Sequence, residues 1–203
     1  MKRITVLSIL ILIAFVGFGQ NAKTKKMLSE IEGQWNLDDN GNVTYTRVVE
    51  APNLTKDEIY NRALNYFVYN YGSGNSVIQT QDKELGSVVG KGFYDDVHVG
   101  ISLVTTYVDC WHIARVDARE GRARIILTLT EYEKEIHGGS TPPVNHGKMK
   151  VELEFPINPK GFAKTVMGKA FYKSHKAANA TIDAIEKSIK EGNTSKEIEN
   201  DDW

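Results

Sequence analysis

The side chains in this sequence that are best suited to chemistry are Cys110 and His112, which lie two positions apart. Residues at i and i+2 of a β-strand point to the same side of a sheet, so this pair could form a thiol nucleophile with its base, or the beginning of a metal site. A zinc site needs three or four converging ligands, and nothing in the sequence brings other histidines to this point. Cys110 also alternates with Val104, Val108 and Ala114, as in a strand that faces a core. We therefore expect a buried and inert thiol, and we assign no catalytic residue, no metal ligand and no cofactor.

Two weaker patterns have simple structural explanations. Gly90 and Gly92 suggest a nucleotide-binding loop, but the dinucleotide fingerprint needs three glycines that open a helix, and here a strand continues. We expect these glycines to permit a bulge or the close approach of another element. Carboxylates at Glu131, Glu133 and Glu135 could do acid–base work, but their alternation is typical of the solvated face of a strand.

Aromatic side chains on the long strands are the best candidates for binding. If the apolar positions of 101–113 and 122–132 face the helices, the opposite sheet face displays aromatic rings among polar neighbours. Such rings are typical of sites that stack on sugars or peptides, and of protein–protein hot spots. They are also good strand formers on any half-solvated sheet, and a register slip of one residue would exchange the two faces. The candidate binding residues are Tyr107, Trp111, Arg124, Thr128 and Tyr132.

A basic segment lies near the C-terminus. Between Lys160 and Lys176 the chain contains no acidic residue, and on a helix Lys169, Lys173 and Lys176 share one face. This face could meet anionic lipid or another acidic surface. The apolar stripe of the same helix is rich in alanine, so we favour a solvated basic face on a helix docked to the sheet over a membrane contact.

Composition limits the function classes. A chain of 203 residues is suited to one domain with a small appendage. Lys and Arg total 25 against 26 Asp and Glu, which gives a formal net charge of −1. A general nucleic-acid binder is distinctly basic, so we expect no nucleic-acid partner. One cysteine excludes a disulfide framework within the chain.

The elements that position these residues follow from periodicity and turn signals. Thr55 and Glu58 form a capping box, which predicts a helix that ends near Gly72. A tight hairpin is expected at Gly121, a loop at 138–147, and a second long helix over 160–190. Strand-like runs lie at 43–50, 77–83, 87–94, 99–117, 122–134 and 150–157. This order of strand, helix, strands and helix predicts a two-layer α+β fold, with hairpin-linked antiparallel strands.

The first twenty residues predict export. Lys2 and Arg3 precede an apolar run from Ile4 to Phe18 and a small, polar exit, as in a secretory signal peptide. The run is shorter than the roughly 20 apolar residues of a spanning helix, so we expect cleavage near Gln20 or Ala22. The product would then be periplasmic, at the cell surface or secreted. The predicted organisation is a signal peptide at 1–20, a lead-in segment at 21–42, a single α+β domain at 43–192 and a disordered acidic tail at 193–203.

The chain resembles bacterial envelope proteins assigned to domain of unknown function 4468. The resemblance is carried, in order, by Trp35, the turn at 38–41, and the segments 43–45, 53–60 and 88–92. It implies a TATA-binding-protein-like fold, in which helices pack on one face of a curved antiparallel sheet. It implies no catalytic residues, and it does not imply DNA binding, because a fold does not determine a function.

Three functions remain open at this point. We favour a non-enzymatic envelope module that uses its sheet face to bind an envelope protein, a peptide or a glycan. One alternative is a periplasmic hydrolase, which would need a convergent nucleophile and base. The other is a structural protein that the basic C-terminal helix holds at a membrane or a partner.

Overall fold

The computed structural model describes residues 21–70, 77–138 and 142–192. The expected signal peptide at 1–20, the expected helix end at Gly72 and the expected acidic tail at 193–203 lie outside these residues. Within the described ranges, no helix has both the length and the apolar character needed to cross a membrane.

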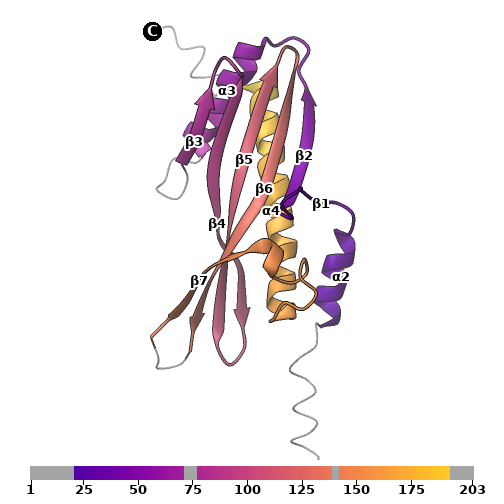
Figure 1. The fold of residues 1–203 in the computed structure, drawn as a ribbon, viewed down its shortest axis with the longest axis vertical. Helices are drawn as coiled ribbons and strands as arrows, with labels where there is room; N and C mark the ends of the chain where they lie inside the picture. Colours follow the sequence, from indigo (N-terminus) through magenta and orange to yellow (C-terminus); the bar gives the residue numbers. More distant parts are fainter. Residues whose placement is uncertain (1–20, 71–76, 139–141, 193–203) are drawn as a thin grey trace, which may run out of the picture.

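The core of the molecule is a seven-stranded antiparallel sheet with the spatial order β1-β2-β6-β5-β4-β3 (Figure 1). The strands are β1 (Asn36–Leu37), β2 (Val43–Glu50), β3 (Val77–Asp82), β4 (Ser87–Ile101), β5 (Thr105–Arg119), β6 (Arg122–His137) and β7 (Val144–Lys150). Strand β6 is long enough to have two partners along the same edge: β2 pairs with its first half and β7 with its second half. The hairpin expected at Gly121 joins β5 to β6, and Gly121 has the positive φ of 69° that such a turn requires.

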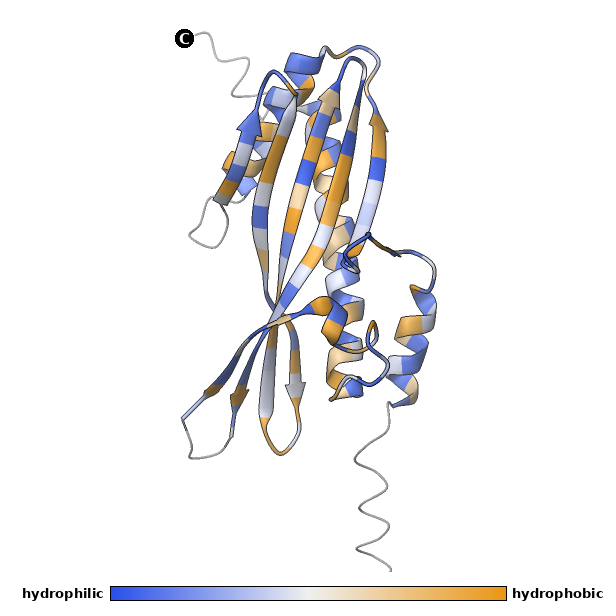
Figure 2. Cartoon of the chain, viewed as in Figure 1, coloured by the Kyte–Doolittle hydropathy of each residue, from blue (hydrophilic) through white to orange (hydrophobic). Residues whose placement is uncertain are grey.

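Helices cover one face of this sheet and leave the other open. The helical elements are α2 (Ala22–Glu30), α3 (Lys56–Asn70), a 3₁₀ turn η1 (Val151–Leu153) and α4 (Lys164–Glu191). In Figure 1, α4 runs behind the strands for much of their length, and α3 and α2 lie on the same side. Along the strands, hydrophobic and hydrophilic residues alternate, as expected where only one sheet face is covered (Figure 2). The predicted two-layer α+β architecture is confirmed.

The capping box and the glycine pattern take the roles predicted for them. The backbone N–H of Thr55 donates to Glu58 Oε2 at 2.8 Å, and the N–H of Glu58 donates to Thr55 Oγ1 at 3.3 Å, so both residues stabilise the start of α3. The helix packs its Phe67 ring directly over Gly90, where an added Cβ would lie 2.5 Å from the ring. Gly90 therefore permits the close approach of α3 to β4.

Strand β6 contains a bulge that exchanges its two faces. The pairing with β5 passes from Leu129 to Glu131, so Thr130 is an extra residue on β6. Before the bulge, the buried positions are Ala123, Ile125, Leu127 and Leu129. After it, Tyr132 is buried with 0% of its surface exposed. The prediction that Tyr132 lies on the open face beside Trp111 is wrong, because one extra residue shifts the two-residue alternation of a strand by one position.

The last part of the sheet also differs from expectation. The strand predicted at 150–157 is wrong: this segment forms η1 and turns, and the true strand β7 falls in the expected loop. The reason is that β2 pairs with β6 only as far as Leu129, so the rest of the β6 edge is free for the chain that follows. Similarly, the run expected as one strand at 99–117 is interrupted by a turn, in which the N–H of Ser102 donates to the carbonyl of Val104 at 3.0 Å.

Candidate binding face of the sheet

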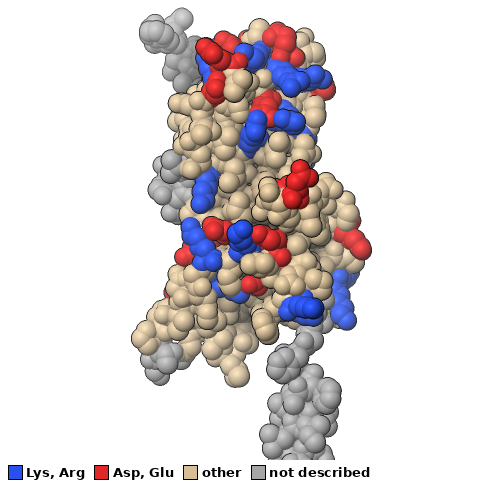
Figure 3. Space-filling view, in the orientation of Figure 1, with Lys and Arg blue, Asp and Glu red and all other residues tan. Residues whose placement is uncertain are grey.

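The open face of the sheet carries four of the five residues that the sequence marks as candidates for binding, all except Tyr132. On β5 the outward side chains are Tyr107, Asp109, Trp111, Ile113, Arg115 and Asp117. Figure 3 views this face and shows acidic and basic side chains mixed in a band across its middle, with a second group near the β5–β6 hairpin. Charged side chains therefore lie on this face together with its aromatic residues.

Trp111 is the centre of a compact cluster on this face. Its ring centroid lies 4.7 Å from that of Phe93. The ammonium groups of Lys148 and Lys91 lie 3.9 and 4.8 Å from the centre of the Trp111 ring, a geometry in which a cation is attracted to the aromatic face. The indole Nε1 donates to Glu133 Oε2 at 3.4 Å. We refer to these five residues as the Trp111 cluster, in which both charge and aromatic surface are available to a partner.

Four strands, β4 to β7, bring the cluster together. Lys91 and Phe93 alternate along β4, and Phe93 lies directly opposite Trp111 on β5. On β7, Lys148 lies opposite Glu133. Sequence reasoning missed Lys91, Phe93 and Lys148. Alternation within 87–94 could have placed the first two on one face, but their meeting with Trp111 depends on the pairing of two strands. Lys148 lies between the loop predicted at 138–147 and the strand predicted at 150–157, so it was assigned to no element.

Tyr107 lies on the same face, four residues along β5 from Trp111. This spacing separates the two residues by about 13 Å along the strand. The ring of Tyr107 lies 4.8 Å from that of His137, whose Nε2 is 2.6 Å from Glu135 Oε1. Both Tyr107 and Trp111 are half-buried, so each presents part of its ring to solvent.

Arg124 and Thr128 face outward as predicted, but Arg124 lies in the other half of the face from Trp111. Arg124 Nη2 donates to Asp117 Oδ2 at 2.7 Å, and Thr128 Oγ1 lies 3.1 Å from Thr44 Oγ1. Desolvation raises the pKa of Asp117, but hydrogen bonds from Arg124 and Arg115 outweigh it and hold the pKa below its usual value. Because Asp117 is six residues from Trp111 on β5, this ion pair lies about 20 Å from the cluster. The structure therefore does not bring Arg124 to the Trp111 cluster, whereas Thr128 lies opposite Ile113, the next outward position of β5 after Trp111.

The remaining candidates for chemistry face the core. Cys110 is fully buried, as expected, and burial raises the pKa of its thiol to about 12. Burial also lowers the pKa of His112 to about 3, and this ring stacks on Tyr94 with centroids 4.1 Å apart. Since the thiolate is the reactive form of cysteine, a thiol with this pKa is not poised for nucleophilic attack near neutral pH.

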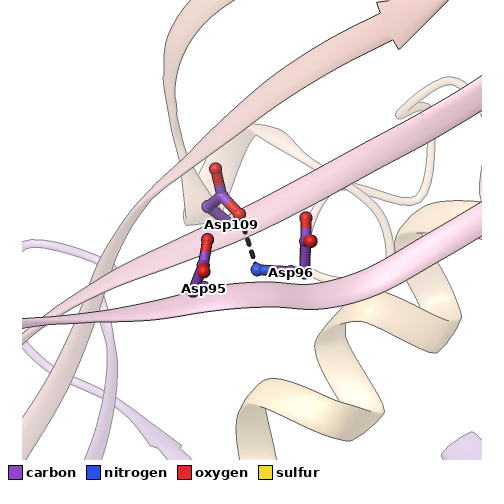
Figure 4. A group of neighbouring side chains, drawn as sticks. All are labelled: Asp95, Asp96 and Asp109. Atoms are coloured by element: carbon purple, nitrogen blue, oxygen red, sulfur yellow. Dashed lines mark hydrogen bonds between the residues drawn. The ribbon is translucent and has the colours of Figure 1, made fainter.

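An acidic group lies beside the Trp111 cluster, where β4 bulges away from β5 (Figure 4). One carboxylate oxygen from each of Asp95, Asp96 and Asp109 lies within 4.8 Å of the others. Oxygen ligands of this kind suit a hard cation such as Ca²⁺. The backbone N–H of Asp96 already donates to Asp109 Oδ1 at 2.8 Å, which is the dashed contact in Figure 4. Burial, with the nearby Asp95, Asp96 and Glu133, raises the pKa of Asp109 although this hydrogen bond opposes the shift.

Comparison with known proteins supports the fold and indicates no catalytic or binding residues. Residues 45–108 match the family model described as a domain of unknown function (DUF4468) with TBP-like fold. A DUF4468 family protein from Bacteroides ovatus has a similar structure, with a TM-score of 0.54 and 18% identity over 81% of this chain and 95% of that one. A TBP-like protein from Parabacteroides distasonis is also similar, with a TM-score of 0.50 and 18% identity over 73% of this chain and 96% of that one.

No curated protein gives a significant match to the chain. The two solved structures are too distant in sequence to indicate more than a shared fold. The family match and the architecture agree with one another, since the matched residues extend from β2 through α3 and β4 into β5. The resemblance to domain of unknown function 4468 is thereby confirmed, and the chain has the TBP-like α+β fold that describes this family.

Proposed function

We propose that this chain is a non-enzymatic binding module that recognises a protein or peptide partner through the open face of its sheet. The observation that carries the proposal is the Trp111 cluster. It offers a half-buried indole, two lysine ammoniums and a carboxylate on a sheet face that no described helix covers. Tryptophan and tyrosine surrounded by polar groups are the residues most enriched at the energetic centres of protein interfaces.

The charges of the cluster favour a protein over a sugar as partner. Lys148 and Lys91 lie against the Trp111 ring, so a flat sugar would have to displace an ammonium before it could stack. An acidic side chain of a partner could instead pair with these lysines and pack beside the ring. Both lysines keep their side chains accessible enough for such a contact, Lys148 being exposed and Lys91 half-buried.

The hydrolase alternative has less support. It needs a nucleophile and a base within reach of a substrate. The thiol of Cys110 is fully buried with a pKa of about 12, and His112 is held neutral by burial, so this pair supports no acyl-transfer chemistry.

The test of the proposal is a comparison of two double variants. The first, Tyr107→Ala with Trp111→Ala, removes both aromatic rings of the candidate face. The matched control, Thr46→Ala with Val48→Ala, alters two exposed residues of β2 on the same face, away from the cluster. Partners captured by the parental protein from the native host are identified by mass spectrometry, and their affinities for the purified variants are then measured.

The expected result is that the first variant loses at least about tenfold in affinity while the control binds like the parental protein, since hot-spot truncations cost about 2 kcal/mol or more. Circular dichroism verifies that both variants are folded. If the first variant keeps every partner at parental affinity, the open face is only a solvated surface. If glycans are captured in place of proteins and the first variant loses affinity for them, the partner of this face is a glycan and not a protein.

We also propose that the chain is exported and acts in the periplasm or at the cell surface. The support is the positive start, the apolar run to Phe18 and the small, polar exit at 19–22. The intact mass of protein isolated from the cell envelope should correspond to a chain that begins within a few residues of Ala22. A mass that still includes Met1 would instead indicate an uncleaved anchor.

A further inference from the structure

A second candidate site lies at the other side of the fold, where α4 begins. A pocket of about 580 Å³ lies between the end of the β4–β5 hairpin and the chain that enters α4. Its strand wall includes His98, Val99, Gly100 and Ile101, and its helix wall extends from Lys160 to Lys169. Figure 1 shows that α4 starts at the end of the molecule where this hairpin projects. The two walls approach closely at the pocket, since a Cβ on Gly100 would lie 3.2 Å from Val166.

The charged side chains that line the pocket are all basic. Lys160, Lys164 and Lys169 contribute to the wall, and the lining contains no carboxylate. Lys164 and Lys169 are half-buried, and neither forms an ion pair with an acidic side chain of the described residues. A partly desolvated ammonium without a counter-charge is a site that attracts an anion.

The start of α4 adds to this positive potential. The helix is 28 residues long, and its N-cap residue, Ala163, has no side-chain oxygen that could accept from the first turn. The first turn contains no acidic residue either. The dipole of a long helix makes such an end a favourable position for a phosphate or another oxyanion.

His98 contributes its ring to the strand wall of the pocket. It lines the pocket and is only 6% exposed, yet its Nδ1 has no hydrogen-bond partner among the described residues. Because this nitrogen is itself inaccessible to solvent, it is an unpaired atom buried behind the pocket wall and not a contact for a ligand.

The rim of the pocket is apolar and solvent-exposed. Phe162 is 90% exposed and Ile101 is 82% exposed, and both line the pocket. Leu103, one residue beyond the pocket lining on the hairpin, is also fully exposed. Large apolar side chains at the mouth of a basic pocket fit a ligand with an anionic head and an apolar portion.

We propose that this pocket binds a phosphate group, with the three lysines and the first turn of α4 around the phosphate oxygens. Several donors line one pocket, which suits the multiple oxygens of a phosphate better than the two oxygens of a carboxylate. The phosphate can belong to a phospholipid headgroup, whose apolar part would contact Phe162 and Ile101, or to a small soluble ester. The site is separate from the Trp111 cluster and does not depend on the function proposed for it.

The test uses the full chain and four soluble probes, with binding measured by calorimetry and by amide chemical shifts. The probes are glycerol 3-phosphate, acetate, and the dihexanoyl forms of phosphatidylglycerol and phosphatidylcholine below their micelle concentrations. The variant Lys164→Gln with Lys169→Gln removes two pocket charges. Its control, Lys176→Gln with Lys187→Gln, removes two charges from exposed positions further along the same helix. Each double variant removes two positive charges, so a general electrostatic effect on anion binding would be equal in the two proteins.

We expect glycerol 3-phosphate and dihexanoyl phosphatidylglycerol to bind the parental chain, to shift the amides of Gly100 and Val166, and to lose at least about tenfold in affinity in the pocket variant alone. If phosphatidylglycerol binds more tightly than glycerol 3-phosphate and Phe162→Ala removes this difference in affinity, the phosphate belongs to a lipid. If the two bind equally, the phosphate belongs to a soluble ester. Acetate that binds as tightly as glycerol 3-phosphate, an equal loss in the control, or no binding of either phosphate compound overturns the proposal.

Discussion

The ammonium of Lys148 lies 3.9 Å from the centre of the Trp111 ring, although the two residues belong to strands that are not neighbours in the sheet. Strand β6 lies between them, and it contributes Glu133, which pairs with Lys148 across the ladder and accepts from the indole N–H. The contact therefore ties β7 to β5 across an intervening strand. It fixes the end of β7 over the centre of the open face.

Replacement of Lys148 by glutamine is expected to lower the free energy of unfolding by about 0.5–1 kcal/mol, the usual size of a solvent-accessible cation–π contact. Denaturant melts measure this change. Lys150→Gln, which alters an exposed lysine on the same strand that lies 3.5 Å from Glu152, should have a smaller effect. In a Trp111→Leu background, Lys148→Gln should leave the free energy of unfolding unchanged. An equal loss of stability in that background would show that Lys148 does not act through the Trp111 ring.

Gly90→Ala is expected to destabilise the protein by about 1–3 kcal/mol, because the new methyl group would lie 2.5 Å from the buried Phe67 ring. The smaller side chain of Phe67→Leu should relieve the clash. The double variant should therefore be more stable than the sum of the two single changes predicts, which thermal or urea unfolding can determine. Simple additivity would mean that α3 does not approach β4 as closely as the structure indicates.

Stability should fall in acid in a way that depends on His112. Burial lowers the folded-state pKa of His112 to about 3, against an ordinary value of 6.5 in the unfolded chain. Between these two values the unfolded chain binds the extra proton. The free energy of unfolding thus falls as pH decreases, by up to about 1.4 kcal/mol per pH unit from this residue. Above pH 6.5 the imidazole is neutral in both the folded and the unfolded chain, so His112 causes no loss of stability there.

The check on this pH dependence is a pair of histidine variants followed by urea unfolding from pH 7 to pH 4. His112→Phe keeps an aromatic ring against Tyr94 but cannot titrate, so its slope should be shallower. His146→Gln, which removes an exposed imidazole, is the control for loss of a histidine away from the core. Parallel curves for the parental protein and His112→Phe would show that His112 is not the titrating group.

Thr55→Ala should lower the stability by about 0.5–2 kcal/mol, since it removes the hydroxyl that accepts from the N–H of Glu58. Thr55→Ser retains that oxygen and is expected to be close to neutral. Chemical denaturation of the three proteins measures the difference. Equal stability of the alanine and parental proteins would place the start of α3 elsewhere.

Cys110 is expected to resist a charged thiol reagent in the native state and to react once the protein is unfolded in guanidinium. Its side chain is fully buried, and its pKa of about 12 leaves almost no thiolate at neutral pH. Mass spectrometry of labelled protein gives the extent of reaction. Rapid native labelling would reopen the question of a reactive Cys110–His112 pair.

Local signals were sufficient to predict the start of α3, the hairpin at Gly121 and the layer architecture. Each depends on residues close together in the chain, such as Thr55 with Glu58. The position of Trp111 on the open face also followed from alternation, since β5 keeps one regular period from Tyr107 to Asp117.

The misplaced residues depended on information that a single segment does not contain. Tyr132 was assigned to the wrong face because the extra residue Thr130 is recognisable only from the pairing of β6 with β5. Lys148 was missed because β7 has few strand-forming residues and is held by the free edge of β6. The basic pocket could not be predicted because His98 and Lys164 come from segments that meet only in the folded chain.

The bulge at Thr130 also constrains how β6 can change in evolution. Before it, the odd-numbered positions face the core, and substitutions there have to remain apolar while Arg124 and its even-numbered neighbours can vary. After it, the rule is reversed: Tyr132 and Lys134, which pairs with the nearly buried Glu154, are the restricted positions. A relative that lost the extra residue would have to exchange the chemical character of every later position of this strand, so we expect insertions and deletions to avoid this bulge.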